Sequence, residues 1–160
     1  MSDALGRHAV ALASVREVAA RAGAERVVLL IDEGDDADPT MIEWAEGGTF
    51  ELTEAGVTER VDPATLAGVV PAVTPDLHPV PATALTVDPD SGELTAPIGV
   101  LAAIAEGIIE LAAAFGGRSV ATAEFATRDP EHPLAIAARP GERVVAQLGM
   151  ETFAFPESWP

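Results

Sequence analysis

The stretch from Pro97 to Phe115 constrains the fold of this chain more than any other. Its only charged residues are Glu106 and Glu110, and its apolar residues recur at the spacing of an α-helix. A helix that is apolar around most of its circumference must be covered on several sides. We therefore predict a core helix over 97–115 that packs against another layer of structure.

The first half of the chain predicts a second helix and part of a sheet. Residues 2–22 have the period of an amphipathic helix. Residues 26–31, Arg-Val-Val-Leu-Leu-Ile, are apolar at successive positions, which predicts a strand buried on both faces. Apolar and polar residues alternate in the segments that follow, and these predict antiparallel strands at 40–46, 49–53 and 57–61.

The second half alternates between turns and short strands. A helical turn at 62–69 and a proline-rich connector at 70–82 precede a predicted hairpin at 83–95. After the core helix, three further strands are predicted at 119–127, 134–138 and 143–148.

The C-terminal tail, residues 152–160, is rich in aromatic side chains. It is interpreted as an edge strand or as a segment that docks on a partner subunit. The whole chain, 1–160, is predicted to be one α+β domain. In it an antiparallel sheet carries the N-terminal amphipathic helix and the buried core helix.

Two stretches resemble the profilin-like group of folds, which includes roadblock, longin and GAF domains. Residues 12–31 are similar to the first helix and strand of such domains, and residues 104–148 to the second helix and meander of a roadblock domain. The resemblance covers under half of the chain, and residues 38–95 would be an insertion. It implies a dimerising scaffold or regulator, as roadblock domains are, or a small-ligand binder, as GAF domains are. It assigns no site residue.

The charge of the chain excludes two classes of partner. The formal net charge is −17, from 26 acidic residues and nine basic ones, all of them Arg. Nucleic acids and anionic membrane surfaces are bound through clusters of Lys and Arg, and no such cluster is visible. We therefore predict neither nucleic acid nor membrane as a partner. The chain has no Lys and no Cys, which excludes Schiff-base chemistry, disulfides and thiolate metal sites.

The location of the protein is predicted from what the sequence lacks. No apolar run has the length of about 18 residues that a membrane span needs. The N-terminus has no signal-peptide pattern, so we expect a cytoplasmic protein. The richness in Ala, Gly, Pro, Arg and Val favours a bacterial or halophilic source with GC-rich codons.

Residues capable of catalysis form no recognisable motif. His8, His78 and His132 are widely separated, and no serine stands in a Gly-x-Ser-x-Gly elbow. His8 is interpreted as a residue at the boundary of an apolar helix face. The acidic segments 32–38 and 88–93 are interpreted as solvated turns, because neither has the ligand spacing of a calcium loop. We predict no catalytic residue, cofactor or metal.

The distribution of charge suggests surfaces that associate. Residues 32–62 contain eleven acidic residues and a single arginine. Such a segment can pair with arginines of the same molecule or of a second one. The predicted contact residues are arginines of the C-terminal strands and aromatic residues of the tail: Arg118, Arg128, Arg139, Arg143, Phe153, Phe155 and Trp159.

The leading interpretation is a non-enzymatic protein-interaction or regulatory domain that binds a protein partner or forms a homodimer. The first alternative is a GAF-like domain that binds a small ligand near Trp44, Phe115 and Phe125, between the sheet and the core helix. The second is a hydrolase or isomerase that uses His78 or His132.

Overall fold

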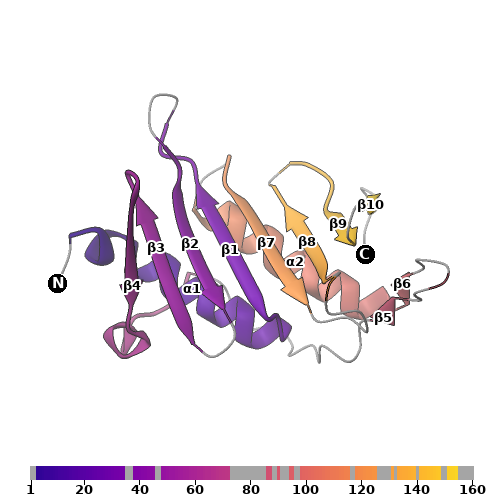
Figure 1. The fold of residues 1–160 in the computed structure, drawn as a ribbon, viewed down its shortest axis with the longest axis horizontal. Coiled ribbons are helices and arrows are strands. Elements are labelled where there is room, and N and C mark those ends of the chain that lie inside the picture. The colour runs from indigo at the N-terminus through magenta and orange to yellow at the C-terminus, as the bar shows by residue number, and fades with distance from the viewer. Residues whose placement is uncertain are drawn as a thin grey trace.

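The protein has an α+β fold, as the sequence predicts (Figure 1). The computed structural model describes residues 3–34, 38–45, 48–72, 86–87, 90, 94–95, 98–115, 118–125, 131, 133–139, 141–148 and 151–154. The two helices are α1 (Asp3–Ala22) and α2 (Ile98–Ala114), and a short 3-10 helix, η1, spans Pro63–Leu66. The strands are β1 (Arg26–Ile31), β2 (Thr40–Ala45), β3 (Thr49–Glu54), β4 (Val57–Val61), β5 (Thr86–Val87), β6 (Leu94–Thr95), β7 (Val120–Phe125), β8 (Leu134–Ala138), β9 (Val145–Leu148) and β10 (Glu151–Ala154).

Eight of these strands form one antiparallel sheet in the order β10-β9-β8-β7-β1-β2-β3-β4. The four strands before η1 make one half of the sheet, and the four strands after α2 make the other. The two halves meet along β1 and β7, where Arg26 lies opposite Glu124 and Leu30 opposite Val120. The strand that begins the predicted tail, β10, is an edge strand. The predicted hairpin is also confirmed, because β5 and β6 pair with each other.

Both helices pack on the same face of the sheet. Helix α1 covers β1, β2 and β3, whereas α2 covers β7 and β8, and the two helices contact each other. Figure 1 shows both helices behind the sheet. No helix in the described part of the chain is long and apolar enough to cross a membrane.

Large side chains of α2 pack on strands that present both small and large buried residues. The helix contributes Ile104, Ile108 and Leu111, each with at most 1% of its surface exposed. The buried residues of β7 and β8 include the alanines Ala121, Ala123 and Ala138 and the large side chains Phe125, Leu134 and Ile136. Small side chains let a helix approach a sheet closely, so bulky residues can fill the interior at native density. The burial of this helix face explains why its residues are apolar.

The fold corrects the prediction that β1 is buried on both faces. Burial alternates along the strand: Val27, Leu29 and Ile31 are buried under α1, whereas Val28 and Leu30 on the other face are only partly buried. The strand is central in the sheet, as expected, but a sheet with helices on one face covers only alternate residues. The apolar character of Val28 and Leu30 is therefore not explained by the described helices.

The turn between β3 and β4 places a non-glycine residue in the left-handed region. Glu54 pairs with Val57, which leaves Ala55 and Gly56 as a two-residue loop. Both have positive φ angles, 51° and 80°, as a type I′ turn requires. An alanine has a steric penalty in this conformation, whereas Asn tolerates it much better.

We therefore expect Ala55→Asn to stabilise the protein by about 0.5–1 kcal/mol, because Asn suits the left-handed position of a type I′ turn. Urea unfolding followed by circular dichroism measures the change. Gly56→Ala is the matched control, and it should destabilise the protein by at least that amount. A loss of stability in Ala55→Asn would contradict this account of the turn.

Candidate functional site

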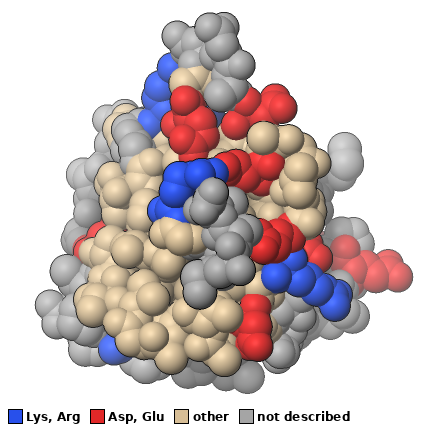
Figure 2. Space-filling view, turned by 90° about the vertical axis from the view of Figure 1, so that its left-hand side faces the viewer, with Lys and Arg blue, Asp and Glu red and all other residues tan. Residues whose placement is uncertain are grey.

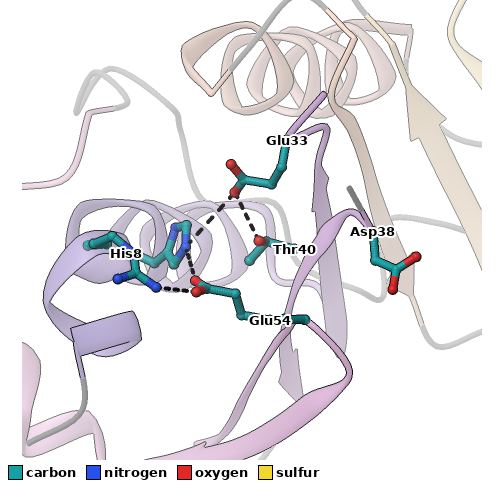
Figure 3. Close-up of a pocket in the computed structure, with 7 residues that line it drawn as sticks. His8, Glu33, Asp38, Thr40 and Glu54 are labelled. Atoms are coloured by element: carbon teal, nitrogen blue, oxygen red, sulfur yellow. Dashed lines mark hydrogen bonds and ion pairs between the residues drawn. The ribbon is translucent and has the colours of Figure 1, made fainter. Parts of the chain in front are cut away.

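A polar pocket lies at the end of the sheet where β1 and β3 finish and β2 begins. Its volume is about 430 Å³. It is lined by residues from α1, from the segments flanking β1 and β2, and from the β3–β4 turn: Arg7, His8, Glu33, Asp38, Thr40, Glu54 and Ala55. Figure 3 shows that these residues converge from separate elements.

His8 connects the helix layer to the sheet in this pocket. Its Nε2 lies 2.7 Å from Glu54 Oε2 and 4.0 Å from Glu33 Oε1. An ionised carboxylate can only accept hydrogen bonds, so Nε2 donates to Glu54. The His8 side chain is only 13% exposed. It is thus a boundary residue, as its position in the sequence predicts, but it also has a specific partner.

Glu54 and Glu33 accept different numbers of hydrogen bonds from the other residues of the pocket. Glu54 also accepts a hydrogen bond from the Arg7 guanidinium, and Glu33 accepts one from the buried hydroxyl of Thr40 at 2.9 Å. The hydrogen bond from His8, and after it the hydrogen bond and charge of Arg7, lower the pKa of Glu54. These donors hold the Glu54 carboxylate in its ionised form at neutral pH.

The pocket combines positive and negative groups but does not form a metal centre. Figure 3 shows the Asp38 side chain directed away from His8. No group of three or more His, Asp or Glu residues in the described part of the chain is placed to hold a metal ion. The arrangement can bind a small polar molecule. It also ties the first turns of α1 to the β3–β4 turn.

A second candidate surface is the face of the sheet opposite the helices, which we call the open face. Its centre carries six partly buried apolar side chains: Val28, Leu30, Met41, Val120, Ala137 and Val145. Thr122 lies among them, between Val28 and Ala137, and Glu43 lies beside Val28 on β2. Leu30 lies directly between Met41 and Val120 in the register of the sheet. In Figure 1 this face is turned to the viewer, and no labelled helix crosses it.

Charged residues flank the apolar centre of the open face. Arg26 Nε donates to Glu43 Oε1, and Arg26 Nη1 donates to Glu124 Oε1, both at 2.9 Å. The hydrogen bond with Glu43, together with the charges of Glu124 and Glu43, raises the pKa of Arg26. Farther toward the β4 edge, Glu51 lies opposite Arg60. An apolar centre with a charged rim is the usual anatomy of a protein–protein interface.

The β4 edge itself has no comparable apolar centre among the residues that the structure describes. Figure 2 shows that side, where acidic side chains and arginines lie beside each other among uncharged residues. Val57, at the start of β4, is 70% exposed, and the next residue, Thr58, is also exposed.

The three aromatic residues of the predicted ligand pocket do not converge. Phe125 is fully buried, whereas Trp44 and Phe115 are partly buried and pack against the core. Trp44 lies opposite Val27 near the start of β1, the end of the sheet where β7 finishes at Phe125. Phe115 precedes β7, and its carbonyl accepts a hydrogen bond from Ser119, so it lies toward the other end.

The predicted interaction residues are dispersed. Arg118 forms an ion pair with Asp32 at 2.9 Å, which links the C-terminal half of the chain to the acidic segment within one molecule. Arg139 pairs with the nearby Glu142 at 3.7 Å, and Arg143 is exposed. Phe153 lies in β10, opposite Ala146. The remaining predicted residues fall outside the described part of the chain: His78, Arg128, His132, Phe155 and Trp159.

Comparisons with known proteins identify no relative. No family model, no curated protein and no solved structure matches the chain. The resemblance to profilin-like domains therefore stays a prediction, and the function must be argued from the chain's own residues.

We expect Glu54→Gln to remove part of the acid sensitivity of the fold. Because the pKa of Glu54 is lowered in the folded state, its stabilising effect is complete above the ordinary Glu pKa of 4.5 and is lost as the pH falls through the lower folded value. The free energies of unfolding of wild type and Glu54→Gln should thus differ most near neutral pH and converge in acid.

Chemical denaturation at a series of pH values between neutral and about 3 measures this convergence. Glu25→Gln is the matched control, because Glu25 is exposed and has no ion pair with a described residue. It should run parallel to wild type across the series. A gap between wild type and Glu54→Gln that stays constant with pH would show that the pKa of Glu54 is not lowered.

Proposed function

We propose that this chain is a non-enzymatic protein-interaction domain that forms a homodimer through the open face of its sheet. The observation that carries this proposal is the apolar centre of a face that no described helix covers. Val28 and Leu30 are apolar at positions where a sheet facing water normally carries polar residues. A partner that covers the face would give these side chains the burial that their sequence predicts.

The balance of charge favours a second copy as the partner. Two molecules that each carry −17 repel each other on most of their surface. The described strand residues of the open face include two arginines and three glutamates, so this face is close to neutral: Arg26, Arg60, Glu43, Glu51 and Glu124. Identical copies can therefore approach there with little repulsion and can pair opposite charges.

The size of the face is also adequate. Eight strands about 4.8 Å apart, each about five residues long, present a flat area of about 600 Å². Side chains that project from the sheet make the accessible area larger than the flat one. Stable interfaces bury about 800 Å² per partner, so face-to-face packing can support a dimer. Two sheets packed in this way would lie about 10 Å apart, between two outer layers of helices.

The first test is the oligomeric state. Sedimentation velocity at micromolar concentration should show a dimer for the wild type. Leu30→Glu should weaken self-association at least about 10-fold, because it places a carboxylate in the apolar centre, where pairing would strip it of water. Circular dichroism checks that the variant is folded.

Val10→Glu is the matched control for this experiment. Val10 is 44% exposed and lies on α1, on the other side of the sheet, so its substitution should leave the dimer intact. A wild-type protein that is monomeric at these concentrations would refute the proposed function. A dimer that persists in Leu30→Glu would place the contact elsewhere, for example at the β4 edge.

The polar pocket favours small-molecule binding as a second candidate function. Its lining is mostly charged, so the ligand would be small and polar, and the pocket differs from the aromatic one predicted from the sequence. Ligand at 100 times its Kd stabilises a protein by about 2.7 kcal/mol, which a thermal-shift screen detects readily.

In a screen of small polar metabolites, this second candidate predicts a rise in Tm for the wild type that His8→Gln abolishes. Phe115→Leu is the control, because Phe115 does not line the pocket and its replacement should leave the response in place. A flat screen, or a response lost in Phe115→Leu and kept in His8→Gln, would count against the polar pocket.

A further inference from the structure

The junction between β1 and β7 is the middle of the eight-stranded sheet. Four strands lie on each side of it: β10, β9, β8 and β7 on one side and β1, β2, β3 and β4 on the other. A two-fold axis that runs parallel to the strands at this junction lets all eight strands of one copy face all eight strands of the other. Any shifted axis leaves outer strands without a partner.

Such an axis exchanges the two central strands and keeps each residue at its level along them. Strand β1 of one copy then faces β7 of the other, and residues that are neighbours in the register become partners across the interface. Arg26 therefore faces Glu124 of the second copy, and Leu30 faces Val120 of the second copy. On the two central strands, a charge thus meets the opposite charge at the level of Arg26, and apolar residues meet at the level of Leu30. At the level between them, Val28 faces Thr122 of the second copy, and Glu43 faces Ala137 of the second copy.

A two-fold axis in the plane of the sheet but perpendicular to the strands gives the opposite result. Rotation about that axis through the level of Val28 would place Arg26 against Leu30 of the other copy and Glu124 against Val120. Both contacts bury a charge against an apolar side chain, which is strongly unfavourable. The register of β1 and β7 thus discriminates between the two symmetric arrangements.

Arg26 has the donors that a second carboxylate needs. A guanidinium has five N–H groups, and one of them is directed to Glu43 and one to Glu124 of the same copy. The Arg26 side chain is 42% exposed, so further donors are accessible from the open face. Glu124 accepts this bond through Oε1, and its second oxygen, Oε2, has its own lone pairs for a donor from another molecule.

We infer that the homodimer has its two-fold axis between β1 and β7, and that Arg26 and Glu124 of the two copies form a reciprocal set of ion pairs that determines its register. This inference rests on the proposed function, because it specifies the arrangement of the same dimer. In the combined cluster, each Arg26 lies between its own Glu124 and that of the second copy. Glu43 retains its bond to Arg26 of its own copy.

Charge exchange between two separate variants tests this arrangement. Arg26→Glu alone places four glutamates where the central pairs meet, and Glu124→Arg alone places four arginines there. Each variant should self-associate about 10-fold more weakly than wild type or worse. Mixed in equal amounts, the two should form a heterodimer, because the carboxylate introduced at position 26 of one variant then faces the guanidinium introduced at position 124 of the other.

The mixture separates a contact between copies from a merely internal ion pair. Mixing cannot restore the Arg26–Glu124 pair inside either variant, so recovery of the dimer requires contact across the interface. Sedimentation velocity of each variant and of the mixture, with one variant fluorescently labelled, measures the recovery. Circular dichroism confirms that both variants are folded.

The same exchange at a helical ion pair is the matched control. Arg21 and Glu17 form an ion pair at 2.8 Å on α1, away from the open face. Arg21→Glu and Glu17→Arg should each remain dimeric, with no added effect of mixing.

The outcomes distinguish this inference from the proposed function. A monomeric wild type refutes the proposed function itself. A dimeric wild type with single variants that remain fully dimeric, or with single variants that mixing fails to rescue, overturns the inferred axis and leaves the homodimer standing. Rescue only in the mixture of Arg26→Glu and Glu124→Arg supports the axis between β1 and β7.

Discussion

The placement of both helices on one face of a single antiparallel sheet determines the other features of this protein. Successive side chains of a strand point to opposite faces of the sheet. Those that point toward α1 and α2 are buried, and those that point the other way are not covered by these helices. The buried set forms one continuous core, to which both helices and the strands beneath them contribute. The other set forms the open face, so the proposed interaction surface is a direct consequence of one-sided packing.

Much of this architecture could be predicted from hydrophobic periodicity, and the failures have physical reasons. The helices, the sequence of strands along the chain and the edge position of β10 follow from local patterns. The apolar run of β1 was ambiguous, because a strand has the same pattern whether the cover on its second face comes from its own chain or from another. The polar pocket could not be predicted: its residues come from separate segments, and in a chain with 26 acidic residues neither Glu33 nor Glu54 stands out.

Opposite charges connect parts of the chain that are distant in sequence. Arg26 pairs with Glu124 across the junction between β1 and β7. Arg118, just before β7, pairs with Asp32, just after β1. Nine arginines cannot balance 26 acidic residues over the whole surface. They can neutralise the carboxylates with which they form ion pairs, as Arg26 and Arg118 do at this junction. Acidic and basic segments of the chain therefore pair within one molecule at this junction. As a result, the charges of the open face nearly cancel.

The central junction also has a consequence for the synthesis of the protein. Arg26 and Glu124 are 98 positions apart in the sequence. Strands β1 to β4 are therefore synthesised long before β7, which lies next to β1 in the sheet. During that interval β1 is an edge strand, and its sequence Val-Val-Leu-Leu-Ile offers unpaired backbone groups and apolar side chains together. The strand β1 therefore stays unpaired along one edge, and prone to aggregation, until β7 has been synthesised and pairs with it.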